Sequence, residues 1–145
     1  MTLEEAVRAR LLAITAVTDL VGTRIYILTL PQTPTWPAIR VALIDEPVTS
    51  AVDGETALAQ ARIQVDAWVD ATAADPYTAA ATLATAIHGN GSYTAPTGLE
   101  HWHGAIGSPA VTVKGMERID RTVSHEIDVE RLVRVRQDYR VSGAA

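Results

Sequence analysis

The sequence predicts an α+β fold, in which an antiparallel β-sheet of about four to five strands is covered on one face by two main helices. Hydrophobic residues recur at helical spacing in residues 3–14 and 76–87, and they alternate with polar residues in several short segments elsewhere. The resulting order is a helix, three strands, a helix and two strands. This order is typical of an antiparallel sheet with its helices on one side, which leaves the other face of the sheet without a helix.

The size and composition favour a single domain that has no disulfides and no membrane-spanning segment. The chain has 145 residues, and we expect residues 1–145 to form a single domain. It contains no Phe, so the core is expected to consist of alanine-rich helix faces packed on Val, Ile and Leu strands. It contains no Cys, which excludes disulfides, thiol catalysis and cysteine-ligated zinc. The net charge of −5 argues against general nucleic-acid binding, and no apolar run approaches the ~20 residues that span a bilayer.

The first elements are predicted by local signals. Thr2 and Glu5 form a capping box at the start of a helix whose apolar residues follow helical spacing. A short helical turn over residues 16–21 is expected to end at Gly22, and residues 24–28 are expected to form a strand. The three prolines in residues 31–37 predict a rigid surface loop.

The next strands are predicted over residues 38–44 and 61–70, with a long loop between them. This loop, residues 47–58, contains the turn signal Asp53-Gly54. Because long loops without structure of their own are usually functional or disordered, we expect it to be mobile in the free subunit and to become ordered on assembly.

The second main helix is predicted to begin after Asp75, a favourable N-cap, with Pro76 at its first position. Its expected buried stripe consists of Tyr77, Ala80, Ala81, Ala84 and Ile87. The polar, glycine-rich residues 92–109 predict a mobile loop. Strands are expected over residues 110–116 and 132–141, with a turn or hairpin arm between them.

Two of the strands have an unusual polar face. In residues 61–70, one side is a plain core face, whereas the other presents Arg62, Gln64, Asp66, Trp68 and Asp70. In the last strand, one side is apolar and the other presents Arg134, Arg136, Asp138 and Arg140.

Three arginines on one face repel one another unless an anion lies nearby. The face with Asp66, Trp68 and Asp70 is the obvious partner, because arginine stacks on tryptophan and forms paired hydrogen bonds to carboxylates. Such a face is either a solvated sheet with exposed ion pairs or a surface that another subunit covers. The interface candidates on this face are Asp66, Trp68, Asp70, Arg134, Arg136 and Arg140. The turn in the long loop adds Asp53 and Gly54.

No residue pattern indicates an enzyme. Asp66 and Asp70 lie about 13 Å apart on one strand, which is wider than the ~5–9.5 Å of a glycosidase pair. His101 and His103 could point to the same side of a strand, but zinc needs three or four ligands, and no signature spacing links them to the other candidates, His88, His125 and Glu100. We therefore expect no catalytic residue, no cofactor and no bound metal.

Four blocks, in their order along the chain, resemble the phage tail terminator (tail-completion) family. They are DLVGTRIYILTLPQ (residues 19–32), WPAIRVALIDEP (36–47), ARIQVDAWVDATAADPYTAAATLATAI (61–87) and RLVRVRQDYRV (131–141). No single block is specific, so their order and spacing support the resemblance, which spans nearly the whole chain.

The resemblance implies an antiparallel sheet with helices on one side and a structural function in the virion, after assembly in the host cytoplasm. A hexameric ring would close the head-proximal end of the tail tube, stop tube polymerisation and dock the head-side connector. DNA would pass through the bore without specific binding. The uncovered sheet face and the long loops would then contact neighbouring subunits and the last ring of the tube protein.

Two other classes of function fit the residues less closely. One is another neck component, such as a head-tail adaptor or stopper, which would bind a portal-side protein instead of the tube. The other is a small ligand-binding or enzymatic α+β domain, which would have a pocket with convergent polar groups or a tightly bound metal.

Overall fold

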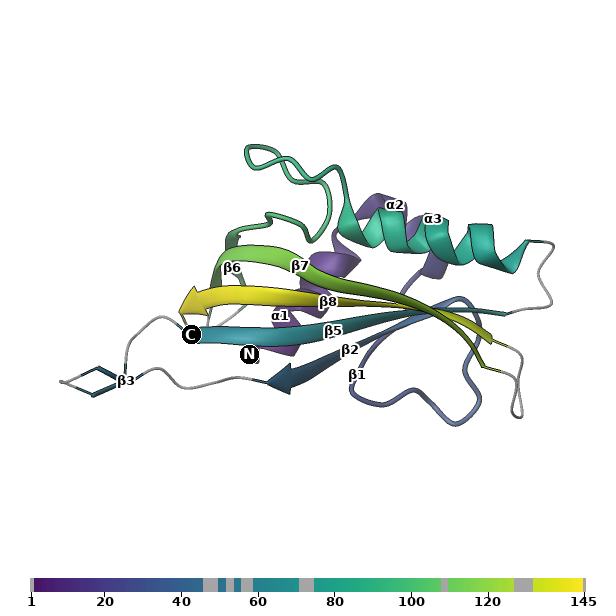
Figure 1. Cartoon of the computed structure of the whole chain (residues 1–145), viewed down its shortest axis with the longest axis horizontal. Coiled ribbons are helices and arrows are strands. Elements are labelled where there is room, and N and C mark those ends of the chain that lie inside the picture. Colours follow the sequence, from purple (N-terminus) through teal and green to yellow (C-terminus); the bar gives the residue numbers. More distant parts are fainter. Residues whose placement is uncertain are drawn as a thin grey trace.

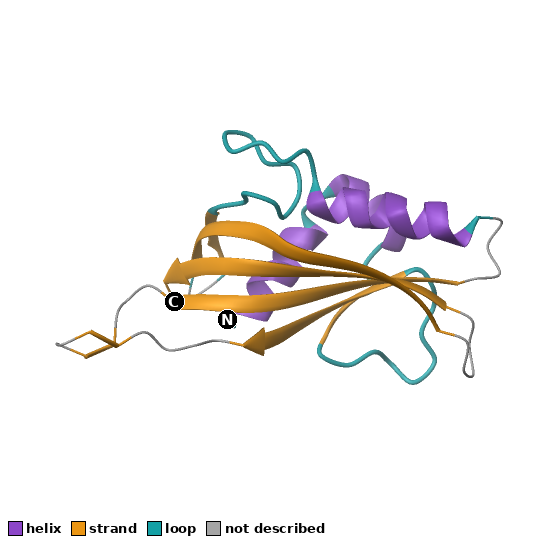
Figure 2. Ribbon diagram, in the orientation of Figure 1, coloured by secondary structure: helices purple, strands orange, loops and turns teal. Residues whose placement is uncertain are grey.

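The computed structural model describes residues 2–45, 50–51, 54–55, 59–70, 75–107, 110–126 and 132–144. The helices lie on one side of a curled six-stranded sheet (Figures 1 and 2). They are α1 (Leu3–Leu12), α2 (Thr15–Val21) and α3 (Pro76–His88). The strands of the sheet are β1 (Ile25–Ile27), β2 (Ala38–Asp45), β5 (Ala59–Asp70), β6 (Gly104–Ile106), β7 (Val111–Glu126) and β8 (Leu132–Ala144). The α+β prediction, with helices on one face, is confirmed.

The sheet is mixed, because one of its pairs is parallel. Its strand order is β1-β2-β5-β8-β7-β6, and β1 pairs with β2 in parallel, whereas the other neighbours are antiparallel. Residues 28–37 return the chain to the end of the sheet where β1 begins, so β2 runs in the same direction as β1. This returning loop lies on the side of the sheet away from α3 (Figure 1).

The capping signals place the helices where the sequence predicts them. The Thr2 side chain accepts a hydrogen bond from the Glu5 backbone, and the Glu5 carboxylate accepts one from the Thr2 backbone at 2.6 Å. That backbone hydrogen bond from Thr2 lowers the pKa of Glu5. Asp75 caps α3 through Thr78, whose side chain and backbone hydrogen bonds lower the pKa of Asp75.

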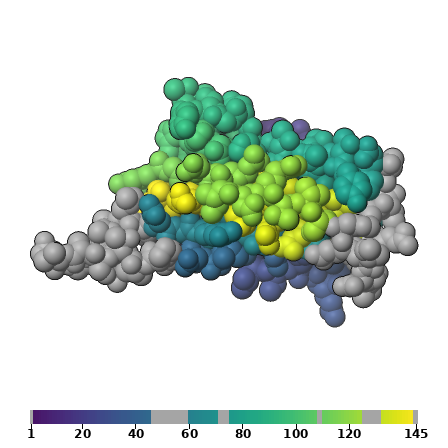
Figure 3. Space-filling view, in the orientation of Figure 1, coloured from purple at the N-terminus to yellow at the C-terminus, as the bar shows by residue number. Residues whose placement is uncertain are grey.

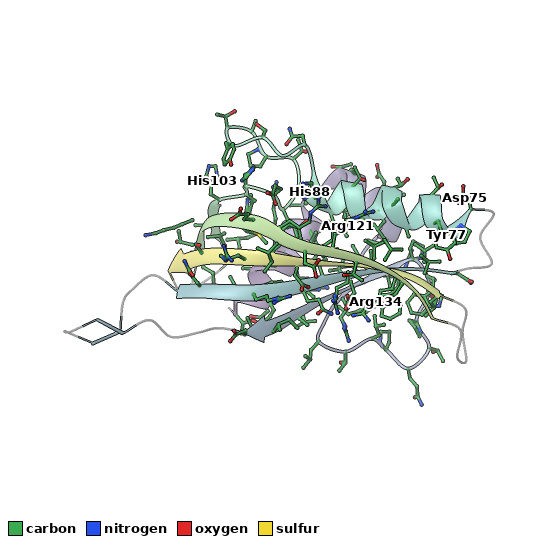
Figure 4. All side chains as sticks on the ribbon, in the orientation of Figure 1. Asp75, Tyr77, His88, His103, Arg121 and Arg134 are labelled. Atoms are coloured by element: carbon green, nitrogen blue, oxygen red, sulfur yellow. The ribbon has the colours of Figure 1, made fainter. Side chains whose placement is uncertain are left out.

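The core lies between the helices and the inner face of the sheet. The predicted inward positions of β5 and β8 are buried: Ile63, Val65, Ala67, Val69, Val133, Val135, Tyr139 and Val141. On α3 the predicted stripe is right at Ala80, Ala84 and Ile87, but wrong at Tyr77, which is 57% exposed, and at Ala81, which is only half-buried. Tyr77 lies at the N-terminal end of α3 (Figure 4), and Leu83 instead completes the buried stripe at helical spacing.

Residues 92–107 are anchored to the body of the protein, so the prediction of a mobile loop is wrong for this segment. Leu99 is fully buried and Trp102 nearly so, and both belong to the core. The backbone of Leu99 donates to Ile87 O at 2.8 Å, and that of His101 donates to Met116 O at 2.8 Å. Figure 3 shows this segment as a raised block above the sheet.

The predicted mobile loop over residues 47–58 lies largely outside the described residues. Within it, β3 (Ser50–Ala51) and β4 (Gly54–Glu55) pair with each other and are not part of the six-stranded sheet. Among the described residues, no helix is both long and apolar enough to cross a membrane.

The close approach of α3 to the anchored segment requires a glycine at its end, and this gives the first prediction. A Cβ at Gly89 would lie 2.2 Å from the Gly98 backbone nitrogen, whereas one at Gly91 would meet nothing within 4 Å. Both glycines have positive φ, which disfavours alanine at either position, but only Gly89→Ala also produces a clash with backbone atoms. We expect thermal melts to show Gly89→Ala to be the less stable variant by about 1–3 kcal/mol. Equal melting temperatures would contradict the packing of residues 97–98 against the end of α3.

Candidate interaction surface

The face of the sheet away from the helices, called the open face below, is formed by alternate residues of β2, β5 and β8. The strand register places Arg40 opposite Asp66, Asp66 opposite Arg136, and Trp68 opposite Arg134. Residues opposite each other in neighbouring strands project from the same face. The prediction that the arginines of the last strand meet the Asp66 and Trp68 face is therefore confirmed.

Asp66 is the centre of the open face and is fully buried. Its carboxylate accepts hydrogen bonds from Arg40 Nε at 3.0 Å and from Arg134 Nε at 3.0 Å. The Gln64 amide donates a further hydrogen bond at 3.0 Å. Because these donors come from β2, β5 and β8, one carboxylate joins the three central strands of the sheet. Arg40 was missed by the sequence analysis, since alternation alone does not give the strand register.

Trp68 lies beside this cluster and is covered from two directions. The Arg134 guanidinium carbon lies 5.0 Å from the centroid of the Trp68 ring, a distance typical of a cation–π contact. Trp36, from the loop between β1 and β2, places its ring 6.2 Å away on the same face. Figure 4 shows Arg134 on the side of the sheet away from α3. Asp70, at the end of β5, is half-buried opposite Leu132.

The other end of the open face is more exposed. Arg62 forms an ion pair with Asp138, which is 2% exposed, and this hydrogen bond raises the pKa of Arg62. Arg140 and Glu117 are both exposed and lie 3.9 Å apart. The open face therefore changes from a buried charge cluster around Asp66 to a loose surface pair at Arg140.

Several buried polar atoms of the open face lack hydrogen-bond partners. Among the described residues, the side-chain atoms of this kind are Trp68 Nε1, Arg136 Nε, Asp138 Oδ1 and, on α1, Arg10 Nε. Buried donors and acceptors are almost always paired, and an unpaired one costs free energy. Three of these four atoms belong to the open face.

The two histidines of the predicted weak metal motif have different environments. The ring of His101 stacks on Tyr93 with 3.6 Å between centroids, and Trp102 between the histidines is buried. His103 Nδ1 lies 3.1 Å from the backbone oxygen of His101. Within the part of the chain that the structure describes, no three His, Cys, Asp or Glu side chains are grouped as metal ligands. That the chain binds no metal and no cofactor stays a prediction.

A polar network lies under α3, on the inner side of the sheet. Tyr139 donates to the Gln137 side chain at 3.3 Å, and Gln137 donates to the Ala84 backbone oxygen at 3.1 Å. His88 Nδ1 lies 3.3 Å from the Tyr139 hydroxyl. Burial raises the pKa of Tyr139, and burial, together with the positive charge of Arg118, lowers the pKa of His88. The folded state therefore favours neutral His88.

The lowered pKa of His88 predicts a loss of stability in acid. A histidine whose pKa is lower in the folded than in the unfolded state stabilises the fold above its unfolded pKa, about 6.5, and this contribution is lost as the pH falls below it. We expect the free energy of unfolding to fall between about pH 7 and 5, and His88→Gln to weaken this dependence. His103→Gln, which changes an exposed histidine, is the control. Denaturant unfolding of the parent and both variants at several pH values gives the free energy of unfolding as a function of pH. Identical profiles for His88→Gln and the parent would contradict the prediction.

The sequence model of the family described as Tail completion protein gp17 matches residues 5–141. The chain belongs to this family. It is therefore a tail completion protein, and the resemblance found in the sequence is confirmed. No curated protein sequence matches the chain.

The fold of this tail completion protein is also similar to a chain of a solved structure titled "Virion of native gene transfer agent (GTA) particle". The two chains are 21% identical with a TM-score of 0.60, and the match covers 99% of this chain and 95% of that one. At this identity the likeness shows a shared fold.

The interface candidates differ in how the fold places them. Asp66, Trp68, Arg134 and Arg136 lie together on the open face, while Arg140 lies at its exposed end and Asp70 at the far end of β5. Gly54 is in β4, whereas Asp53 lies outside the described residues. Their role in an interface stays a prediction.

Truncation of Asp66 tests whether the cluster holds the sheet together. Asp66→Ala leaves Arg40 and Arg134 without their shared carboxylate, and removing one partner of a buried ion pair costs about 3–5 kcal/mol. The matched control is Glu117→Ala, which removes the exposed partner of Arg140 and should cost about 0–1 kcal/mol. Denaturant unfolding measures both. A cost for Asp66→Ala as small as that of Glu117→Ala would show that the cluster does not stabilise the fold.

Proposed function

We propose that this tail completion protein closes the head-proximal end of a tail tube as a hexameric ring. The ring ends tube polymerisation and provides the docking surface for the head-side connector. The protein is then part of the virion, after assembly in the host cytoplasm. Its partners are further copies of itself, the tube protein and the connector or stopper protein.

The observation that supports this proposal most is the open face. It has no helix over it in Figure 1, and its strands bring Trp68 next to Arg134 and Arg136. Tryptophan and arginine are enriched in the centres of protein interfaces. When one surface of a subunit contacts a different surface of its neighbour, repetition of that contact forms a ring if the rotation between subunits closes, and a filament if it does not. A neighbouring subunit on the open face would cover its half-buried and exposed arginines, Arg40, Arg134, Arg136 and Arg140.

The charge of the chain also fits a ring through which DNA slides. Proteins hold DNA mainly by neutralising phosphates with Lys and Arg. This chain has a net charge of −5, and the open-face arginines Arg40, Arg62 and Arg134 already pair with carboxylates of their own chain. A bore through a ring of acidic subunits passes DNA without gripping it.

Arg136 is the best residue with which to test the proposal. Arg134 holds Asp66 and Trp68 within the subunit, so its removal disturbs the fold, whereas Arg136 Nε has no hydrogen-bond partner among the described residues. We expect Arg136→Ala to melt within a few degrees of the parent and to require about tenfold or more protein to cap tubes. Electron microscopy of purified tail tubes mixed with each protein counts the capped ends.

The matched control is Arg121→Ala. Arg121 lies opposite Gln137 and therefore on the helix side of the sheet, so its loss should leave capping unchanged. Normal capping by Arg136→Ala would show that the open face is not part of the interface. Binding of the parent protein to a portal-side protein but not to tubes would instead identify another neck component.

A further inference from the structure

The outer surface of the layer formed by α2 and α3 carries almost no charge. The two helices contact each other on the same side of the sheet (Figures 1 and 2). Among the seven residues of α2 and the thirteen of α3, Asp19 is the one Asp, Glu, Lys or Arg. Charged residues make up 20% of the chain, and helix α1 includes Glu4, Glu5, Arg8 and Arg10. The lack of charge is therefore a property of α2 and α3 and not of every helix in the chain.

This surface also exposes large apolar side chains. Leu20 of α2 is 38% exposed and Tyr77 of α3 is 57% exposed. The exposed positions of α3 also include Thr82 and Thr85. A helix that faces water usually has charged residues on its outer side, whereas the centres of protein interfaces are poor in charge. The outer surface of α2 and α3, called the helix face below, has the composition of an interface.

The helix face and the open face lie on opposite sides of the same sheet (Figure 1). A ring of six subunits needs two different surfaces on each subunit, because a contact between identical surfaces is complete after two subunits. The open face is one of these two surfaces in the proposed ring. The helix face is placed to be the other, since a subunit with the two surfaces on opposite sides can contact one neighbour on each side.

The charges of the open face favour an uncharged counterpart. Arg40 and Arg134 pair with Asp66, and Arg62 pairs with Asp138, so these charges need no carboxylate from another chain. A charged side chain of a neighbour, buried against groups that are already paired, would lose its water without gaining a partner, which is costly. The helix face brings almost no such side chain to the contact.

The remaining arginines of the open face distinguish the helix face from a second open face. A contact between two open faces would bring the arginine-bearing strands of both chains together, and like charges at close range cost free energy. Against the helix face, Arg136 and Arg140 meet no array of cations. The hydroxyl oxygens of Thr82 and Thr85 can instead accept hydrogen bonds from the guanidinium groups.

We infer that the open face of one subunit docks on the helix face of the next, so that Arg136 and Arg140 lie against α2 and α3 of the neighbour. This inference rests on the proposed function. It names the second of the two surfaces that a ring requires.

Thr82→Lys tests the helix face without weakening the helix. Lysine is a better helix former than threonine, and Thr82 is exposed, so α3 should remain folded. In the ring, the new ammonium group would lie against the arginines of the neighbour. We therefore expect about tenfold or more protein to be needed to cap purified tail tubes, counted by electron microscopy.

The matched control is Thr94→Lys, the same change at an exposed position in residues 92–107, which should cap tubes like the parent. Thermal melts of both variants check the fold. Normal capping by Thr82→Lys, or an equal loss in Thr94→Lys, would overturn the inference.

The absence of cysteine from the chain allows the contact to be measured directly. Thr122 of β7 is exposed and lies opposite Arg136, so it projects from the same side of the sheet as the open face. Thr82→Cys and Thr122→Cys are made in two differently tagged chains, which are mixed with purified tail tubes and treated with a short bismaleimide. We expect a crosslinked heterodimer on a denaturing gel.

The control pair, Thr94→Cys with Thr122→Cys, should give little product. Crosslinking of Thr122→Cys chains to one another in place of the heterodimer would show that two open faces meet, and would overturn the inference.

The outcomes also separate the inference from the proposed function. A crosslinked heterodimer in closed rings that never bind tubes would keep the docking and overturn the capping. Capped tubes made by the parent, with neither the crosslink nor an effect of Thr82→Lys, would keep the capping and overturn the docking.

Discussion

The buried carboxylate of Asp66 is the constraint on which the arrangement of the sheet depends. A carboxylate without solvent is costly unless charged donors surround it, and here Arg40, Gln64 and Arg134 do so from three adjacent strands. A slip of one residue in either neighbouring strand would turn these donors to the opposite face. The cluster therefore specifies the register of β2, β5 and β8, and it does so on the face that no helix covers.

This constraint also explains how one sheet can serve the fold and an assembly. The inner face is apolar and packs against α1, α2 and α3, so it supplies most of the hydrophobic stabilisation. The open face is held together mainly by charges paired within the subunit, between Asp66 and the arginines Arg40 and Arg134 and between Asp138 and Arg62.

Residue patterns in the sequence predicted the elements but not their partners. The capping signals at Thr2 and Asp75, and the alternation in β5 and β8, are local, and the structure confirms them. Arg40 was missed because its contact with Asp66 depends on register between strands far apart in the sequence. The burial of Leu99 and Trp102 was not predicted, because these two residues have glycine and polar neighbours and follow no periodic pattern. The parallel pairing of β1 depends on the path of residues 28–37, which composition does not specify.

The central claim is that the open face is an interface between subunits of a ring at the end of the tail tube. A cryo-electron microscopy structure of the protein on purified tail tubes tests it most directly. The account predicts a closed hexameric ring at one end of each tube, with Arg136 and Arg140 on the open face covered by a neighbouring subunit. A ring in which the open face is exposed to solvent, or protein bound along the sides of the tube, would contradict it.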